Sequence, residues 1–293
     1  MTQLTWGRRY LMCPPVHFSV LYEINSWMHT AVPVDPEAAR AQWEGLVATL
    51  ESAGAVVERL DPVAGLPDLV FTANAGLVDG SRFVASAFRH PQRQGETAID
   101  TAWFAAHGYD IVSLPAGVVH EGAGDALPFA GVLVSGYRTR SDAAAGTALS
   151  RLIGAPVRTV ELVDPRYYHL DLTFCPLDER RAILNPAGWD RYGCTVMESL
   201  VAEPLVLEAE EAELFCANSV VIGTTIVMPA CPPRVGRILE GWGFDVIVAA
   251  VPEFLKAGGG CRCLTLALDV TLGHAGPSPS SPSAPPGSVA ARG

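Results

Sequence analysis

The sequence predicts an α/β protein in which a unit of hairpin, helix and strand recurs about five times and closes around an axis. Three observations lead to this prediction. Paired β-rich runs are separated by turn residues, as at Asp79-Gly80, which is a strong hairpin signal. Each pair is followed by an amphipathic helix and then by a single apolar strand. The unit returns roughly every 50 residues, although its residues are not repeated letter by letter.

A unit of this kind cannot bury both of its faces alone. Neighbouring units are therefore expected to pack against one another around an axis. An ordinary open α/β sheet is the alternative, and the order of the elements does not decide between the two.

The predicted elements follow one another in a regular order. In the first helix, Asp35-Pro36 supplies an N-cap and a first-turn proline, apolar side chains recur at helical spacing, and Gly54 ends the helix after residue 53. The other helices are predicted over residues 96–107, 142–153, 189–201 and 233–241. Single strands are predicted over residues 56–60, 109–114, 157–163, 204–207 and 245–248. Hairpins are predicted within residues 68–86, 124–137, 169–186 and 215–228, with residues 68–74 and 169–176 taken as strand. An extended segment over 8–14, an irregular loop over 16–30 and a last strand over 264–268 complete the order.

Composition excludes several classes of function. The chain has 293 residues and a formal net charge of −11, without a basic block. Binding to the nucleic-acid backbone needs clustered Lys and Arg, so DNA and RNA are unlikely partners for this sequence. The longest apolar stretch, residues 215–228, is too short and too polar to span a bilayer. We therefore expect no membrane partner.

The cysteines and the ends of the chain bear on its compartment. Seven cysteines form an odd set without the spacing of a disulfide scaffold, and the first residues lack the apolar core of a signal peptide. A cytoplasmic protein with free thiols is expected. Cys261 and Cys263 do not have metal-ligand spacing with a second Cys or His pair, so neither a metal nor a cofactor is predicted. A catalytic domain is expected over residues 1–272, followed by a disordered Pro/Ser-rich tail over residues 273–293.

The stretch around Gly258-Gly259-Gly260 is the strongest single functional signal. Consecutive glycines permit positive φ and a close approach of the backbone to another group. Cys263 follows shortly after them, at the mouth of this turn, where a nucleophile would lie. The structural alternative is a flexible turn before the last strand, with Cys263 as a small buried hydrophobe.

Other polar residues cluster at the ends of the predicted strands. His169 and Asp171 are expected on one face of an extended segment, because strand side chains alternate. Each such residue alone is more often structural, but the set recurs at the same place in successive units. A thiol with a histidine indicates covalent catalysis, and carboxylates suit a cationic, nitrogen-rich electrophile such as a guanidinium. Arginines would then bind a substrate carboxylate. The remaining members of the set are Asp68, Asn74, Arg93, Glu121, Asp125 and Arg140.

Four motifs together resemble the guanidine-modifying (amidinotransferase, or pentein) superfamily. They are residues 67–74 (PDLVFTAN), 121–125 (EGAGD), 168–171 (YHLD) and 258–265 (GGGCRCLT), and they occur in the order of that family. The resemblance covers about residues 8–270. It implies a five-bladed α/β propeller of repeated ββαβ units, in agreement with the repeats described above.

A closer resemblance is to the arginine dihydrolase branch, which is found in cyanobacteria fused to a further C-terminal domain. The segments that carry it are residues 11–15, 24–28, 68–78, 93–96 and 254–265. No such additional domain is expected here, and Ser26 stands where Pro is expected. The implied reaction converts arginine to ornithine, ammonia and carbon dioxide, through a covalent thiouronium intermediate.

The resemblance also implies a role for each residue of the set. Cys263 is the nucleophile, whose thiolate is expected to form readily beside a cation and a histidine. His169 protonates the leaving nitrogen and then activates water. Glu121 and Asp171 hold the guanidinium, and Cys261 is a spare thiol. The residues implied to bind the rest of the substrate are Asp68, Arg93 and Arg140, the two arginines through its α-carboxylate.

Asn74 distinguishes possible products. The corresponding residue of the resembling arginine deiminases is an aspartate, which only accepts hydrogen bonds. An amide both donates and accepts, so Asn74, together with Asn25, is predicted to hold a ureido intermediate for a second attack.

Other functions stay open at this point. They are a dimethylarginine dimethylaminohydrolase that forms citrulline and dimethylamine, a related amidinotransferase, and an arginine-binding sensor without catalysis. The expected partner is a small molecule, arginine or a methylated arginine, and the sequence leaves open a homo-oligomer.

Overall fold

The computed structural model describes residues 3–272. The predicted tail, residues 273–293, lies outside the described residues, and so does the beginning of the predicted catalytic domain at residues 1–2. Among residues 3–272, no helix has both the length and the apolar character needed to cross a membrane.

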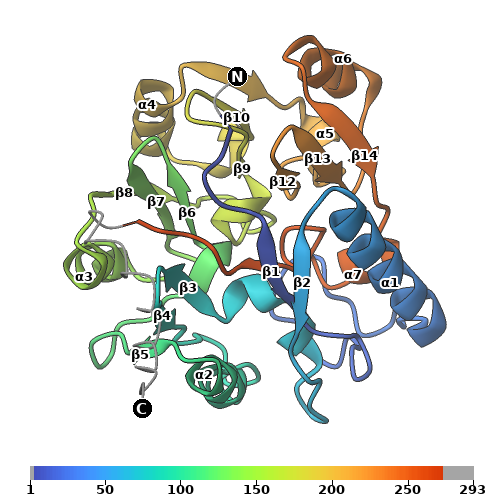
Figure 1. Cartoon of the computed structure of the whole chain (residues 1–293), viewed down its shortest axis with the longest axis vertical. Helices are drawn as coiled ribbons and strands as arrows, with labels where there is room; N and C mark the ends of the chain where they lie inside the picture. The colour runs from blue at the N-terminus through green and yellow to red at the C-terminus, as the bar shows by residue number, and fades with distance from the viewer. Residues whose placement is uncertain (1–2, 273–293) are drawn as a thin grey trace, which may run out of the picture.

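Five three-stranded sheets are arranged around the centre of the molecule (Figure 1). In each sheet the middle strand pairs antiparallel with one neighbour and parallel with the other. Four sheets follow one another along the chain: β3–β4–β5 (Gly76–Asp79, Arg82–Ala85, Asp110–Val112), β6–β7–β8 (Ala126–Phe129, Val132–Tyr137, Val157–Glu161), β9–β10–β11 (Phe174–Pro176, Arg181–Leu184, Glu203–Val206) and β12–β13–β14 (Val220–Ile222, Thr225–Met228, Asp245–Val248). The predicted repeat is therefore a repeated ββαβ unit, and the architecture is the predicted five-bladed propeller.

The fifth sheet joins the two ends of the described chain. β1 (Arg9–Met12) pairs antiparallel with β15 (Leu266–Ala267) and parallel with β2 (Val56–Arg59). Tyr10 lies opposite Ala267 in this register. The last strand thus completes the blade that the first strand begins, and the ring of blades closes.

A helix lies on the periphery of each blade and connects the antiparallel hairpin to the parallel strand (Figure 1). The parallel pairing requires this crossover, because a parallel strand cannot be reached through a tight turn. The five crossover helices are α1 (Pro36–Ser52), α2 (Glu96–Ala106), α3 (Ala143–Ile153), α4 (Arg191–Leu200) and α6 (Pro233–Gly241). Each lies within two residues of its predicted bounds.

The cap predicted for the first helix is confirmed. Asp35 Oδ1 accepts hydrogen bonds from the backbone N–H groups of Glu37 (2.9 Å) and Ala38 (3.1 Å), which have no partner inside the helix. The apolar face of α1 is buried, with Trp43 and Leu46 almost completely enclosed. Two short helices, α5 (Ala209–Glu213) and α7 (Pro252–Leu255), were not predicted.

Three predictions of strand are wrong. Residues 68–74 form the 3₁₀ turns Pro67–Val70 and Thr72–Asn74, and residues 170–172 form the 3₁₀ turn Leu170–Leu172. Residues 215–219 form a turn before β12. Their amide hydrogens bond locally, as from Phe71 to the Asp68 carbonyl (2.9 Å). The apolar side chains that suggested strands are buried in these turns, and burial, not sheet pairing, accounts for their composition.

Candidate active site

One turn of each blade contributes to a common site. It directly precedes the first strand of the blade: Thr72–Asn74 precedes β3, Gly122–Gly124 precedes β6 and Leu170–Leu172 precedes β9. Irregular turns hold the same position before β12 and β15. Hydrogen bonds connect these turns to one another through the polar residues Asn74, Glu121, His169, Asp171, Asn218 and Cys263.

The glycines before Cys263 allow three close approaches. Gly258 has a φ of +82°, which disfavours any other residue, and a Cβ there would lie 2.9 Å from the Tyr168 hydroxyl. A Cβ on Gly259 would collide with the ring of Phe71. A Cβ on Gly260 would lie 2.8 Å from the side-chain oxygen of Asn218. The prediction that this turn approaches other groups closely is confirmed.

Cys263 lies beside a carboxylate and an amide. Its side chain is buried, with Sγ donating to Asp171 Oδ2 (3.3 Å) and accepting from Asn218 Nδ2 (3.1 Å). Burial, and then the Asp171 charge, raise the pKa of the thiol well above its ordinary value. Burial also raises the pKa of Asp171 to about 7, opposed first by its hydrogen bond with Cys263. The expectation of a thiolate formed readily beside a cation and a histidine is therefore wrong for this arrangement.

His169 lies beside Glu121 instead. Its Nε2 is 2.9 Å from Glu121 Oε2, which also accepts from Arg140 Nη1 at 2.8 Å. Burial lowers the pKa of His169 to about 4 against the effect of Glu121, so the ring is neutral at pH 7 and Nε2 carries the donated hydrogen. Although burial acts to raise it, the Arg140 charge holds the pKa of Glu121 well below its ordinary range. His169 and Asp171 are not on one face of a strand, because the chain turns between them.

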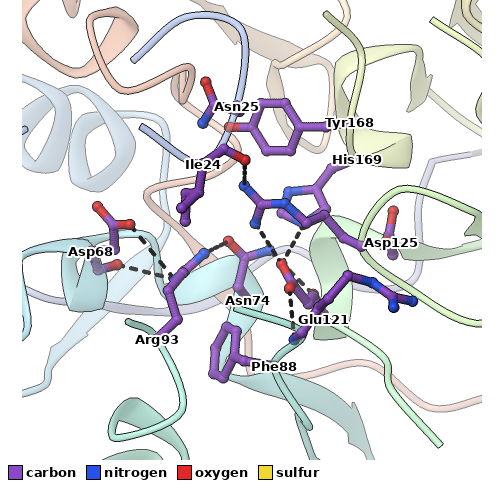
Figure 2. Close-up of polar contacts among 12 residues, drawn as sticks. Ile24, Asn25, Asp68, Asn74, Phe88, Arg93, Glu121, Asp125, Tyr168 and His169 are labelled. Carbon is purple, nitrogen blue, oxygen red and sulfur yellow. Dashed lines mark hydrogen bonds and ion pairs between the residues drawn. The ribbon is translucent and has the colours of Figure 1, made fainter. Parts of the chain in front are cut away.

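A second arginine borders the site from the other side. Arg93 forms two bonds with Glu96, from Nε to Oε1 (2.9 Å) and from Nη2 to Oε2 (2.7 Å). Its Nη1 donates to Asn74 Oδ1 (2.9 Å), and Asn74 Nδ2 donates to the Glu121 carbonyl (3.1 Å). Figure 2 shows Asp68 and Arg93 on one side of the site, with Tyr168 and His169 on the other. Asp68 Oδ2 accepts from the Tyr22 hydroxyl (3.0 Å).

Two carboxylate oxygens in this region lack a hydrogen-bond partner among residues 3–272. They are Oδ1 of Asp68 and Oδ1 of Asp171, and both are buried. Nε of Arg140 is a buried donor that likewise has no acceptor among these residues. Unsatisfied buried groups are costly, and a polar ligand or water with donors for the carboxylates and acceptors for the arginine would satisfy them.

A small pocket, with a cavity volume of about 10 Å³, lies beside these groups. Its walls are formed by Asn25, Met28, Asp68, Phe71, Asn74, Arg93, Arg140, Tyr168, Ala257 and Cys263. The loop over residues 16–30 contributes to the wall: Asn25 Nδ2 donates to the Ala257 carbonyl (3.0 Å), and Arg140 Nη2 donates to the Ile24 carbonyl (3.1 Å). Figure 2 shows Ile24 and Asn25 above Asn74 and Arg93.

A larger cavity of about 230 Å³ lies elsewhere, lined by Trp6, Phe129, Asp178 and Thr271 among others. No histidine or cysteine lines it. Size alone therefore does not identify the site; the smaller pocket has the converging thiol, carboxylates and arginines. Among the described residues, no group of three or more His, Cys, Asp and Glu side chains is arranged to hold a metal ion.

Six of the predicted site residues line the pocket: Asn25, Asp68, Asn74, Arg93, Arg140 and Cys263. The other three lie directly behind the wall, where Asp171 contacts Cys263 and Glu121 contacts both Arg140 and His169. Asp125 accepts from Ser141 (2.5 Å) and the Leu170 amide (3.1 Å), and so supports the turns. Cys261 is buried, and its Sγ lies 3.3 Å from the Ala249 carbonyl.

Sequence reasoning missed Asn218, Tyr22, Tyr168 and Glu96. Asn218 had a usable signal, because it lies before β12 in the same position that Asn74 occupies before β3. Glu96 also had one, since it follows Arg93 by three residues on the first turn of α2. Nothing in the sequence marks Tyr22, which lies in an irregular loop.

Curated proteins that resemble this chain act on guanidino compounds. No model of a protein family matches the sequence. The N(G),N(G)-dimethylarginine dimethylaminohydrolase of Mycobacterium tuberculosis is 36% identical over 259 residues, which cover 88% of this chain and 85% of the relative. The bifunctional arginine dihydrolase/ornithine cyclodeaminase AgrE of Nostoc sp. is 39% identical over 263 residues. That match covers 88% of this chain but 37% of the bifunctional protein.

Solved structures that resemble this chain come from the same two kinds of enzyme. The N-terminal domain of ArgZ, an arginine dihydrolase from the ornithine–ammonia cycle in cyanobacteria, is known as a cysteine-to-serine variant bound to substrate. It superposes with a TM-score of 0.87 at 37% identity, over 90% of this chain and 99% of that domain. A dimethylarginine dimethylaminohydrolase adduct superposes with a TM-score of 0.75 at 19% identity, over 91% of this chain and 100% of the other, and shares the fold.

Proposed function

We propose that the substrate of this chain is L-arginine, which it converts with two molecules of water to ornithine, two molecules of ammonia and carbon dioxide. The chain belongs to the guanidine-modifying superfamily, in the group of the dimethylarginine dimethylaminohydrolases and arginine dihydrolases, and is a hydrolase of guanidino carbon–nitrogen bonds. The observation that carries this proposal is the amide of Asn74 in the pocket wall, where a carboxylate would suit only a cation.

The guanidinium of the substrate binds beside Cys263 and Asp171. The free Oδ1 of Asp171 accepts its hydrogens, and its positive charge offsets the repulsion between Asp171 and a thiolate. At the other end, the α-carboxylate binds the spare donors of Arg140 and Arg93, and Oδ1 of Asp68 accepts from the α-ammonium group. The zwitterionic end of arginine thus matches the arginine–aspartate pairing on that side of the pocket.

In the first half-reaction, the Cys263 thiolate attacks the guanidinium carbon and an S–C bond forms. The C–N bond to a terminal nitrogen breaks, and ammonia leaves with a proton that His169 takes up from solvent and passes on, which replaces the proton that Cys263 gave up. Water, deprotonated by His169, then attacks the thiouronium carbon, and the S–C bond breaks to give a ureido product. Glu121 orients the imidazole through its 2.9 Å contact and is kept ionised by Arg140. An ArgZ variant covalently bonded to a reaction intermediate supports such a covalent path.

The second half-reaction is the hydrolysis of this ureido product. Its carbonyl is neutral, so it needs a donor where the guanidinium needed an acceptor. Asn74 Nδ2 has one hydrogen beyond the one it gives to the Glu121 carbonyl, and Asn25 lies on the same pocket wall. The Asn74→Asp variant should therefore release citrulline in place of ornithine. Ornithine as its only product would contradict this role.

The second candidate is dimethylarginine hydrolysis to citrulline and dimethylamine. It is favoured by the Mycobacterium tuberculosis relative, which this chain matches over 85% of its length. The two activities demand different space at the terminal guanidino nitrogens, so substrate preference separates them.

The deciding experiment incubates the purified protein separately with L-arginine and with asymmetric dimethylarginine, and identifies the products by mass spectrometry. Ornithine with two equivalents of ammonia from arginine is the expected result. Citrulline and dimethylamine from the methylated substrate alone would support the second candidate and contradict the first. The Cys263→Ser variant is the control, and it should turn over neither compound.

A further inference from the structure

Asn218 occupies the turn before β12, the position from which the other blades supply Asn74, the Glu121 turn and Asp171. Its side chain is fully enclosed, with a residue exposure of 0%. It does not line the pocket, and the mechanism above makes no use of it. Its amide nevertheless contacts the sulfur atom that reacts.

The orientation of the Asn218 amide is determined by its partners. Oδ1 accepts from three backbone N–H groups of the nucleophile turn, those of Gly260 (3.1 Å), Arg262 (3.1 Å) and Cys263 (3.2 Å). Only an oxygen can accept these hydrogens, so the NH₂ group must point the other way. Nδ2 then lies 3.2 Å from the Asp171 carbonyl and 3.1 Å from Cys263 Sγ. Both of its hydrogens have an acceptor.

Besides Asn218, two titratable groups act on Sγ, and a third charged group acts on one of them. Asp171 Oδ2, at 3.3 Å, accepts the thiol hydrogen and repels a thiolate. Tyr168 interacts electrostatically with Cys263 from the His169 side, and the Arg262 charge acts on Asp171. Among the described residues, the only side-chain N–H that reaches Sγ is that of Asn218. A buried thiolate here is stabilised by that donor and by the backbone N–H of Gly260.

We propose that Asn218 is a catalytic residue: its Nδ2–H stabilises the Cys263 thiolate while its Oδ1 holds the turn that directs Sγ into the pocket. When the S–H bond breaks, the electron pair stays on sulfur and the proton passes through Asp171 Oδ2 to solvent. The hydrogen bond from Nδ2 then strengthens, because its acceptor carries the charge. This inference rests on the proposed function only for the reaction that the thiolate performs.

The Asn218→Asp variant separates the two functions of the side chain. An aspartate keeps one oxygen for the three N–H groups, but it replaces the donor facing Sγ with a second oxygen. The rate of Cys263 alkylation by neutral iodoacetamide at pH 8, followed by mass spectrometry of the peptide, should fall at least about tenfold. The pH midpoint of alkylation should rise by roughly one unit or more. The matched control is Asn185→Asp, a buried asparagine outside the pocket, which should leave both quantities unchanged.

If Cys263 in the Asn218→Asp variant is alkylated at the wild-type rate and with an unchanged pH profile, the proposal is overturned, whether or not turnover falls. If that variant does not fold in a thermal melt, Asn218→Ala replaces it, and wild-type alkylation there would be equally contrary. Iodoacetamide needs no guanidino recognition. A failure of the arginine reaction would therefore appear in the product analysis and leave this test intact.

Discussion

The two sides of the pocket each contain a buried carboxylate, and the two carboxylates differ in their partners. On the base side, defined by His169, Glu121 and Arg140, the carboxylate lies between a cation and a hydrogen-bonded neutral ring. On the nucleophile side, defined by Cys263, Asp171 and Asn218, the carboxylate faces a thiol and has one free oxygen. No cation lies within ion-pair distance of Asp171 among residues 3–272.

This difference indicates that the nucleophile side binds a cation. Burial raises the pKa of Asp171, and burial together with the Asp171 charge raises the pKa of the Cys263 thiol. Without a bound cation, the thiol of the nucleophile side therefore stays protonated. A guanidinium would supply the missing positive charge. The base side needs no such completion, and its contacts are already formed. The substrate is thus expected to activate the nucleophile that attacks it.

The largest effect is expected from His169→Gln. Loss of a general acid and base should lower kcat by about 10²- to 10⁴-fold. Because Sγ contacts Asp171 and Asn218, iodoacetamide should still alkylate Cys263 at close to the wild-type rate. Alkylation that falls in parallel with kcat would show a thiolate–imidazolium pair and break the distinction between the two sides.

Asp171→Asn should act with opposite signs on two measurements. The kcat/KM for arginine should fall by about a hundredfold, since a buried cation loses its partner. Alkylation of Cys263 by iodoacetamide should become faster, because the repelling charge that raises the pKa of the thiol is gone. Steady-state kinetics and peptide mass spectrometry measure the two effects, and slower alkylation would contradict the account.

A smaller effect is expected from the arginines, and it should differ between them. Arg93 uses four of its five N–H donors on Glu96, Asn74 and the Asp68 carbonyl, whereas Arg140 uses two. Arg140→Lys should therefore raise KM for arginine by about tenfold, the worth of a charge-assisted hydrogen bond. Arg93→Lys should raise it less. The reverse order in KM would assign the α-carboxylate to Arg93.

The smallest effect on catalysis is expected from His120→Gln. His120, like His169, is buried and neutral, and burial lowers its pKa to about 4. Its ring contacts the Gly122 amide (3.1 Å) and Ser135 Oγ (3.4 Å), not the pocket. At pH 8, kcat should change little.

The effect of His120 should appear in stability instead. Its folded-state pKa is depressed below the unfolded value, so the stabilisation is complete above about pH 6.5 and is lost as the pH falls towards 4. Urea unfolding of both proteins should show the wild type losing on the order of 1–3 kcal/mol relative to His120→Gln across that window. A difference that is independent of pH would contradict the burial of a neutral ring.

Sequence reasoning succeeded where one residue type has one use. The crossover helices follow from apolar spacing and caps. The recurrence of polar residue types at one place in each unit indicated which side chains would gather, and the roles of these residues stay predictions. It failed at the 3₁₀ turns, because Leu69, Val70 and Phe71 give the same apolar run whether they lie in a strand or in a buried turn.

The electrostatics of the site were also beyond the sequence. That Cys263 contacts Asp171, and His169 contacts Glu121, depends on the packing of separate blades. Glu121 was expected on the guanidinium; its Oε2 is occupied by His169 and Arg140, and a contact with substrate stays a prediction. Asn218 could have been predicted if the repeat had been applied to the unit that contains β12, β13 and β14.

The most direct test of the account compares two alkylating agents of nearly identical shape at Cys263. Chloroacetamidine is cationic and chloroacetamide is neutral, so each rate is divided by the rate with a free thiol to remove intrinsic reactivity. The account predicts that the wild type prefers the cationic reagent by at least about tenfold, because a charge-assisted contact with Asp171 stabilises it. It also predicts that Asp171→Asn abolishes this preference. Equal normalised rates in the wild type would show that the nucleophile side has no preference for a cation. This result would contradict the central claim, that Asp171 binds the positively charged group of the substrate.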